Sequence, residues 1–191
     1  MAPPIFANPH HESGMAERKI KINRAPVLAL WTAVVAERLG FDPNEALSLG
    51  KAVAGLNAQS KGRRLGIFRP RPAEILEARK RKRGQEFWVE LLGRPVPAIN
   101  TADGVRAVIG AKAIEPEGVR RYLESKFGDD LIAARAAMKA LANRFKPEEL
   151  QREAFAFYEQ FRPQIPEGVR GWGAKGELDL GRISALSSRP R

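Results

Sequence analysis

The sequence predicts a mainly α-helical α+β protein: a helical bundle that contains a helix-turn-helix-like pair and one small β-hairpin. Apolar residues recur at helical spacing in several segments, and proline, glycine or aspartate stands where each helix would begin or end. One segment, 86–100, instead shows the alternation typical of strands. The hydrophobic content of 43% and the charged content of 29% are those of a globular protein.

The length of 191 residues is enough for one sizeable core or two small ones. We expect a single globular domain over residues 15–186, which can be subdivided into a basic helical part, 15–84, and a hairpin with a helical bundle, 85–186. Residues 1–14 show no periodicity and are predicted to be a disordered tail. Residues 187–191 are predicted to be a loose basic tail.

The stretch from Ala25 to Gly66 predicts two helices joined by a tight turn. Gly40 ends the first helix, because glycine adopts the left-handed conformation at low cost. Asp42, Pro43 and Glu45 then match a capping box with proline at the first helical position. The apolar positions of the first helix are Val27, Leu28, Trp31, Val34, Val35 and Leu39.

The second helix of this pair carries small residues on one face, which allows another backbone to approach closely. Helix, glycine turn and helix together form the outline of a helix-turn-helix. If the pair reads DNA, the face toward the bases offers Asn44, Leu47, Ser48 and Lys51. The alternative is an ordinary helical hairpin within the core. The small residues are Ala46, Gly50 and Ala54.

The net charge of +11 favours a polyanionic partner, and most of this charge is concentrated in one basic segment, residues 61–83. The segment holds ten Lys or Arg residues and only two acids. Guanidinium groups in a small glycine-flanked loop suit phosphate, although a solvated charged end is the alternative. The cations are Lys61, Arg63, Arg64, Arg69, Arg71, Arg79, Lys80, Arg81, Lys82 and Arg83.

Residues 86–100 predict the hairpin, with its turn at Gly93. The returning strand contains Pro95 and Pro97, which lack N–H groups, so we expect it to pair on one side only, as an edge strand. Trp88 could stack on a base beside the basic segment, or it could cover the core. The core position is favoured on general burial preference.

Four further helices are expected over residues 101–110, 116–128, 129–145 and 147–162. The first would be capped by Thr101 and ended by Gly110, with Val105, Val108 and Ile109 on its apolar face. The others have clear 3.6-residue periodicity. The aromatic residues of the last helix are predicted to belong to the core; they are Phe155, Phe157, Tyr158 and Phe161.

Residues 171–176 read GWGAKG, which has the G-x-G-x-x-G spacing of dinucleotide-binding loops. That motif requires a preceding strand and a helix directly after it, whereas strand-like residues 177–180 follow here. We therefore expect no dinucleotide site. A loop carrying Arg170 and Lys175 could bind phosphate, and a compact turn is the alternative.

Several classes of site are excluded by composition. The absence of cysteine excludes disulfides, thiolate catalysis and cysteine-ligated metals. His10 and His11 are the only histidines and lie in the predicted tail, so we expect no metal site, no cofactor and no catalytic residue. No secretory signal or membrane-length apolar run is present. We expect a cytoplasmic protein without membrane contact, associated with the nucleoid if it binds DNA.

The strings INRAPVLALW, AERLGF, GLNAQSKGRRLG and GWGAKG together resemble a family of small bacterial proteins. The resemblance covers about Lys19 to Leu186. That family has no assigned activity, so the resemblance implies no site residue and no cofactor.

The first functional hypothesis is therefore a non-enzymatic nucleic-acid-binding protein, with DNA favoured over RNA, that binds mainly through phosphate contacts. The helix-turn-helix-like pair would add base contacts. Besides the ten cations of the basic segment, the expected contacts are Asn44, Ser48, Lys51, Arg170 and Lys175. Two alternatives stay open: an interaction or scaffold module with an acidic protein partner, and an enzyme acting on a phosphorylated or nucleic-acid substrate.

Overall fold

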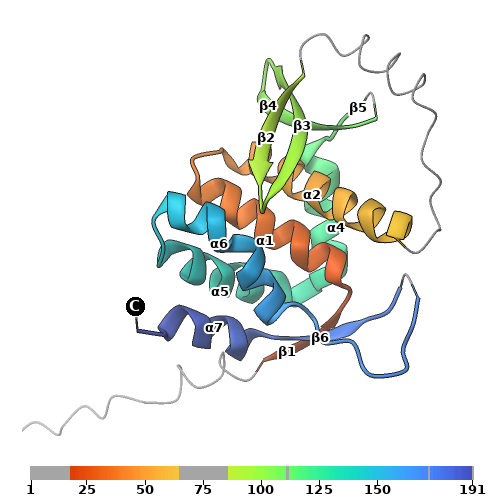
Figure 1. Cartoon of the computed structure of the whole chain (residues 1–191), viewed down its shortest axis with the longest axis vertical. Coiled ribbons are helices and arrows are strands. Elements are labelled where there is room, and N and C mark those ends of the chain that lie inside the picture. Colours follow the sequence, from red (N-terminus) through yellow and green to blue (C-terminus); the bar gives the residue numbers. More distant parts are fainter. Residues whose placement is uncertain (1–17, 65–85, 111, 172, 191) are drawn as a thin grey trace, which may run out of the picture.

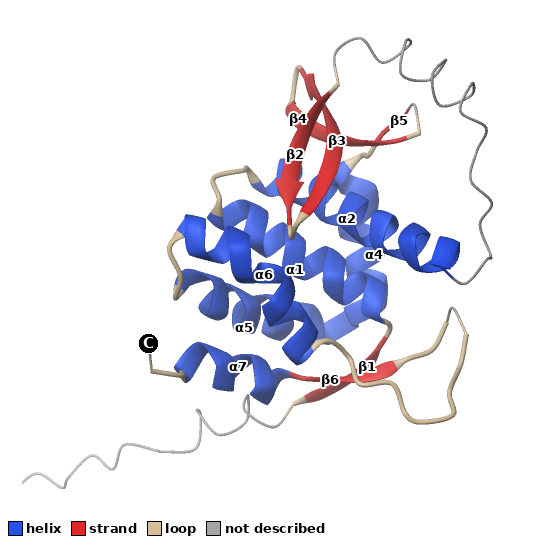
Figure 2. Cartoon of the chain, in the orientation of Figure 1, coloured by secondary structure: helices blue, strands red, loops and turns tan. Residues whose placement is uncertain are grey.

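The computed structural model describes residues 18–64, 86–110, 112–171 and 173–190. The protein is mainly helical and has two antiparallel sheets, one of four strands in the order β2-β3-β4-β5 and one that pairs β1 with β6. The helices are α1 (Arg24–Arg38), α2 (Pro43–Arg64), α4 (Pro116–Phe127), α5 (Leu131–Asn143), α6 (Pro147–Phe161) and α7 (Leu180–Ser188). The strands are β1 (Lys19–Ile22), β2 (Phe87–Leu91), β3 (Arg94–Thr101), β4 (Gly104–Ile109), β5 (Lys112–Ala113) and β6 (Gly176–Asp179). The two sheets lie at opposite ends of the helical body (Figure 2).

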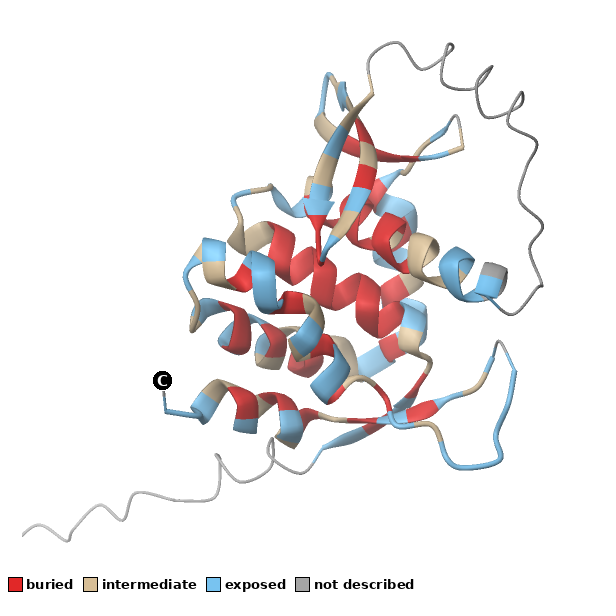
Figure 3. Cartoon of the chain, viewed as in Figure 1, coloured by how far each residue is buried: buried red, intermediate tan, exposed pale blue. Residues whose placement is uncertain are grey.

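Helix α1 runs through the centre of the molecule, with α2, α5 and α6 around it (Figure 1). Every residue from Pro26 to Ala36 is buried, as Figure 3 shows. A helix that is apolar on all sides belongs in the core, and that is its position here. The indole Nε1 of Trp31 donates a hydrogen bond to the Ala154 carbonyl at 2.7 Å. Its ring meets Phe161 edge-on, with ring centres 5.3 Å apart.

The predicted turn between α1 and α2 is confirmed. Gly40 has a φ of +108°. The Asp42 carboxylate accepts hydrogen bonds from the N–H groups of Asn44 and Glu45, at 2.8 and 3.0 Å. The Glu45 carboxylate in turn accepts one from the Asp42 N–H at 3.0 Å. These reciprocal bonds form the expected capping box and start α2 at Pro43.

The face of α2 that carries small residues packs against α1, as the sequence predicted. A Cβ atom added at Gly50 would lie 2.4 Å from the Ala29 carbonyl oxygen. The two backbones therefore approach too closely for any side chain at this position. The close contact fixes how α2 crosses α1.

The prediction of one small hairpin is wrong, because residues 104–109 form strand β4 and not a helix. The Thr101 hydroxyl donates to the Gly104 carbonyl at 2.7 Å, and Gly104 has a φ of +102°. Asp-Gly at this point is a hairpin-turn signal, and the β-branched residues after it favour a strand. Residues 87–109 thus form a three-strand meander, to which β5 adds a short fourth strand.

Strand β3 is an inner strand, so the prediction that it lies at an edge is wrong. Its two halves differ, however. Pro95 and Pro97 pair only with Glu90 and Trp88 of β2, whereas β4 pairs with β3 from Ala98 onward. The prolines therefore occupy the half of the strand that has one neighbour, where a missing N–H is tolerated.

The side chain of Trp88 is 64% exposed, which contradicts the expected core position. Successive residues of a strand point to opposite faces of the sheet. Val89 and Leu91 take the face that packs on the helices, so Trp88 lies on the other face.

The C-terminal region returns to the start of the chain, since β6 pairs antiparallel with β1. Helix α7 follows directly and was not predicted; Asp179 caps it by accepting a hydrogen bond from the Gly181 N–H at 2.8 Å. Ser187 and Ser188 form its last turn instead of a loose tail. Arg144 holds this end through the carbonyls of Ser187 and, at 2.8 Å, Arg189.

Candidate anion-binding groove

A groove of about 680 Å³ lies where α1 begins and α2 ends. Its walls come from the first turns of α1, the last turns of α2, the start of β3, the C-terminal half of α6 and the loop before β6. The C-terminal end of α2 and this loop lie on the same side of the molecule (Figure 1). The groove therefore brings together segments that are far apart in the sequence.

Positive side chains from α1, α2, β3 and the residue that follows α6 line this groove, against a single carboxylate, that of Glu159. In the part of the chain that the structure describes, none of these cations forms an ion pair, although ion pairs such as Arg135 with Glu37 occur elsewhere. The groove is thus a concave surface of unneutralised positive charge, which concentrates anions. The cations are Arg24, Lys61, Arg64, Arg94 and Arg162.

Two arginines and a tyrosine meet in the groove. The Arg24 guanidinium donates from Nε to the Pro163 carbonyl at 3.1 Å, and the Tyr158 hydroxyl donates to the Arg24 carbonyl at 3.3 Å. Burial lowers the pKa of Arg24 below its ordinary value, and the positive charge of Arg162 lowers it further. Since an anion bound near Arg24 and Arg162 would offset this repulsion, the pair is suited to phosphate or carboxylate.

Neutral side chains hold the groove in shape. Arg94 donates from Nη2 to Asn57 Oδ1 at 3.0 Å, which ties β3 to α2. Asn23 stands at the N-cap position of α1 but does not cap it. Its amide instead donates to the carbonyls of Gly173 and Ala174, at 2.9 and 3.3 Å, and fastens the glycine-rich loop to the groove rim.

Apolar side chains also line the groove. Phe155 of α6 is half-buried there, with its ring centre 6.0 Å from that of Tyr158. Leu28, Ala54 and Ile165 are further apolar lining residues. The groove therefore offers a ligand both positive charge and an aromatic surface.

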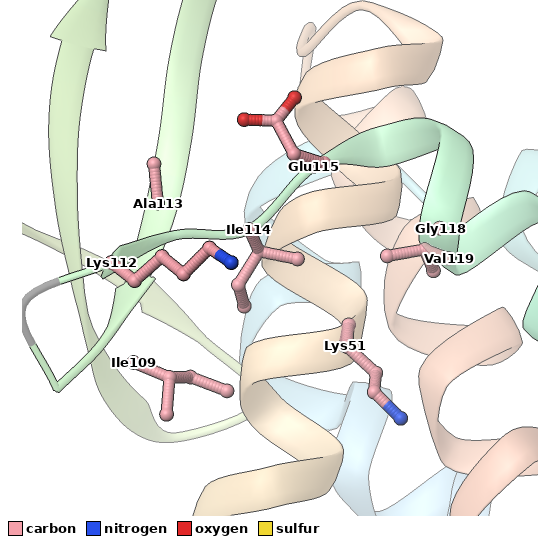
Figure 4. A pocket seen from close by; sticks show the side chains of 8 residues that line it. All are labelled: Lys51, Ile109, Lys112, Ala113, Ile114, Glu115, Gly118 and Val119. Atoms are coloured by element: carbon pink, nitrogen blue, oxygen red, sulfur yellow. The ribbon is translucent and has the colours of Figure 1, made fainter.

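A second, shallower hollow of about 390 Å³ lies between α2, α4 and the β4–β5 hairpin (Figure 4). Lys51 lines it, with its ammonium nitrogen 3.6 Å from the centre of the Tyr122 ring. Burial lowers the pKa of Lys51, and the nearby Lys126 lowers it further. The Glu115 carboxylate points away from Lys51 (Figure 4). The remaining lining is mostly aliphatic, so this hollow holds much less positive charge than the groove.

The face of α2 that was expected to read bases is largely covered. Ser48 is fully buried and accepts a hydrogen bond from the Ala107 N–H at 3.0 Å, and Leu47 is buried too. Asn44 accepts a hydrogen bond from Arg120 of α4 at 3.1 Å. Because β4 and α4 pack on this face, the recognition-helix interpretation of Leu47 and Ser48 is wrong.

Of the predicted phosphate contacts, Lys61 and Arg64 line the groove. Arg170 and Lys175 are exposed on the loop that borders it, but they do not line it. The glycine-rich loop leads into strand β6, as the strand-like residues after it predicted. The remaining predicted contacts, which lie outside the described residues, are the Arg63 side chain and Arg69, Arg71, Arg79, Lys80, Arg81, Lys82 and Arg83.

Sequence reasoning missed Arg24, Arg94 and Arg162 as groove residues. Arg24 carried one usable signal: it is the first residue of α1, and a cation at a helix N-terminus opposes the helix dipole. Such a placement suggests that the charge serves another purpose. No local signal marks Arg94 or Arg162.

No protein family, no curated protein and no solved structure matches the chain. The resemblance to a family of small bacterial proteins therefore stays a prediction. Among the described residues there is no cluster of three or more potential metal ligands. The described helices include none that is long and apolar enough to cross a bilayer.

Proposed function

We propose that this protein is a non-enzymatic nucleic-acid-binding protein, with DNA as the favoured ligand, and that the groove between α1, α2 and α6 binds its phosphates. The observation that carries the proposal is the convergence of five cations from α1, α2, β3 and the end of α6, none of them paired with a carboxylate within the described residues. Like charges held together in the folded chain repel one another. A polyanion neutralises them and releases its own counterions, which favours binding.

The sequence beyond the groove provides further support. Residues 65–85 follow directly on Arg64 and carry seven Lys or Arg residues against two acids. A small anion gains only from the groove, whereas a long polyanion also gains from this charge. The total charge of +11 further favours a polyanionic ligand.

The test compares two double variants that remove the same charge. Lys61→Gln/Arg64→Gln removes one lysine and one arginine at the groove, and Arg121→Gln/Lys126→Gln removes one of each from α4. All four residues are exposed. Binding of a fluorescein-labelled 20-base-pair DNA is followed by fluorescence anisotropy at several salt concentrations.

The groove variant should bind several-fold more weakly than the α4 variant. Its plot of log affinity against log salt should be shallower by about 0.9 for each phosphate that the variant no longer neutralises. Equal weakening by both variants would show that overall charge and not the groove is responsible. Absence of binding at low salt to any DNA or RNA would refute the proposed function. Equally strong competition by polyglutamate of matched charge would favour the acidic-partner alternative.

A further inference from the structure

The lining of the groove combines two kinds of side chain. Arg24 and Arg162 supply positive charge, and the half-buried ring of Phe155 supplies an aromatic surface. A nucleotide has the same two parts, a charged phosphate and a flat base. Stacking on an aromatic side chain is a general means of holding an unpaired base, whereas charged side chains alone suffice to contact the backbone of a duplex.

The size and shape of the groove also favour a single unpaired nucleotide over a duplex. Its volume of about 680 Å³ lies in the range of roughly 300–1,000 Å³ found for sites that enclose one small molecule. A duplex presents its phosphates on a convex surface and keeps its bases stacked inside. It can therefore reach the rim cations, such as Lys61 and Arg64, but it cannot place a base against Phe155.

We propose that the groove binds an unpaired nucleotide of a single-stranded nucleic acid, an inference that rests on the proposed function. The base stacks on Phe155, and the adjoining phosphate lies between Arg24 and Arg162. Lys61 and Arg64 at the end of α2 contact the neighbouring phosphates of the strand. The protein therefore binds single strands more tightly than duplexes of the same sequence.

The first measurement uses the unmodified protein with a labelled single-stranded 20-mer and with the duplex formed from it, at equal salt. We expect the single strand to bind at least about tenfold more tightly, consistent with stacking of one base. Unlabelled adenosine monophosphate serves as a competitor. Micromolar displacement of the strand by this nucleotide would show that the groove is a site for free nucleotides, and would overturn the inference.

The second measurement uses variants of α6. Phe155→Leu keeps an apolar side chain but removes the aromatic ring, and should weaken single-strand binding about tenfold while leaving duplex binding unchanged. Phe157→Leu is the matched control, since Phe157 is also half-buried but packs on Phe145 at 4.7 Å, away from the groove. Phe155→Tyr retains the ring and should retain the affinity, which separates stacking from a general loss of structure.

The outcomes separate this inference from the proposed function. Duplex binding as tight as single-strand binding, or equal effects of Phe155→Leu and Phe157→Leu, would overturn the inference and leave a phosphate-binding groove. Failure of every nucleic acid to bind would overturn both. If Phe155→Leu does not fold, the inference is still tested by the comparison of single-stranded with duplex nucleic acid and by the Phe155→Tyr variant.

Discussion

The Ser48 hydroxyl accepts a hydrogen bond from the Ala107 N–H at 3.0 Å and so joins the middle of α2 to strand β4. One turn earlier, the Glu45 carboxylate accepts a hydrogen bond from the Val105 N–H at 2.8 Å. Two side chains of one helix thus satisfy two N–H groups of one strand. This attachment seats the sheet on α2 and closes that face of the helix to any ligand.

Replacing Ser48 by alanine tests this attachment. The change leaves the buried Ala107 N–H without its acceptor, which should cost about 1–3 kcal/mol of unfolding free energy, measured by urea denaturation. Ser125→Ala is the control, because that hydroxyl is exposed and bonds only within α4; it should stay within about 0.5 kcal/mol. Equal stability of the two variants would contradict the assigned role of Ser48.

The two tryptophans of the described chain make a second matched pair. Trp31 is fully buried and hydrogen-bonded, so Trp31→Ala should cost about 3–5 kcal/mol. Trp88 is mostly exposed, and Trp88→Ala should change stability by less than about 0.5 kcal/mol. Thermal melting by circular dichroism distinguishes them. A melting temperature for Trp31→Ala near that of the parent would mean that α1 is not the centre of the core.

Two glycines of α2 should respond in opposite directions to the same substitution. At Gly50 a methyl group would meet the Ala29 carbonyl oxygen at 2.4 Å, so Gly50→Ala should destabilise by about 1–3 kcal/mol. At Gly55 the nearest atom is 3.6 Å away, and alanine is the better helix former. Gly55→Ala should stabilise by about 0.5–1 kcal/mol. Denaturant titration gives both values, and a stabilising Gly50→Ala would contradict the close α1–α2 packing.

Stability should fall at high pH because of Tyr158. Burial raises its pKa to about 12 from an ordinary value of 10. The contribution of the neutral hydroxyl is complete below pH 10 and is lost as the pH rises to 12, by about 2–3 kcal/mol in total. Tyr158→Phe should flatten this part of the curve of unfolding free energy against pH.

Tyr122 provides the comparison for this pH effect. Burial raises its pKa too, but the side chain is less buried, so Tyr122→Phe should remove a smaller part of the fall. An unchanged pH profile for Tyr158→Phe would show that its hydroxyl is not desolvated in the folded protein.

Local sequence signals predicted α1, α2, α4, α5 and α6, but they missed α7 and predicted a helix over residues 101–110, where a strand forms. The Asp42 capping box and the left-handed Gly40 depend on residues within a few positions of each other. In residues 101–110, the spacing of Val105, Val108 and Ile109 indicates a helix, whereas Asp103-Gly104 indicates a hairpin turn. These residues form a strand, because the turn and the β-branched side chains favour one and because β3 pairs with it.

By itself, the sequence determined the α1–α2 hairpin, the close-packed glycine face and the concentration of positive charge near the end of α2. Each follows from backbone conformation, side-chain size or charge at neighbouring positions. Only the tertiary structure decided which faces are open. It buried Ser48 beneath β4 and brought Arg24 beside Pro163, 139 positions away. Packing between distant segments depends on the whole fold, so the groove and its arginines could not be found from local patterns.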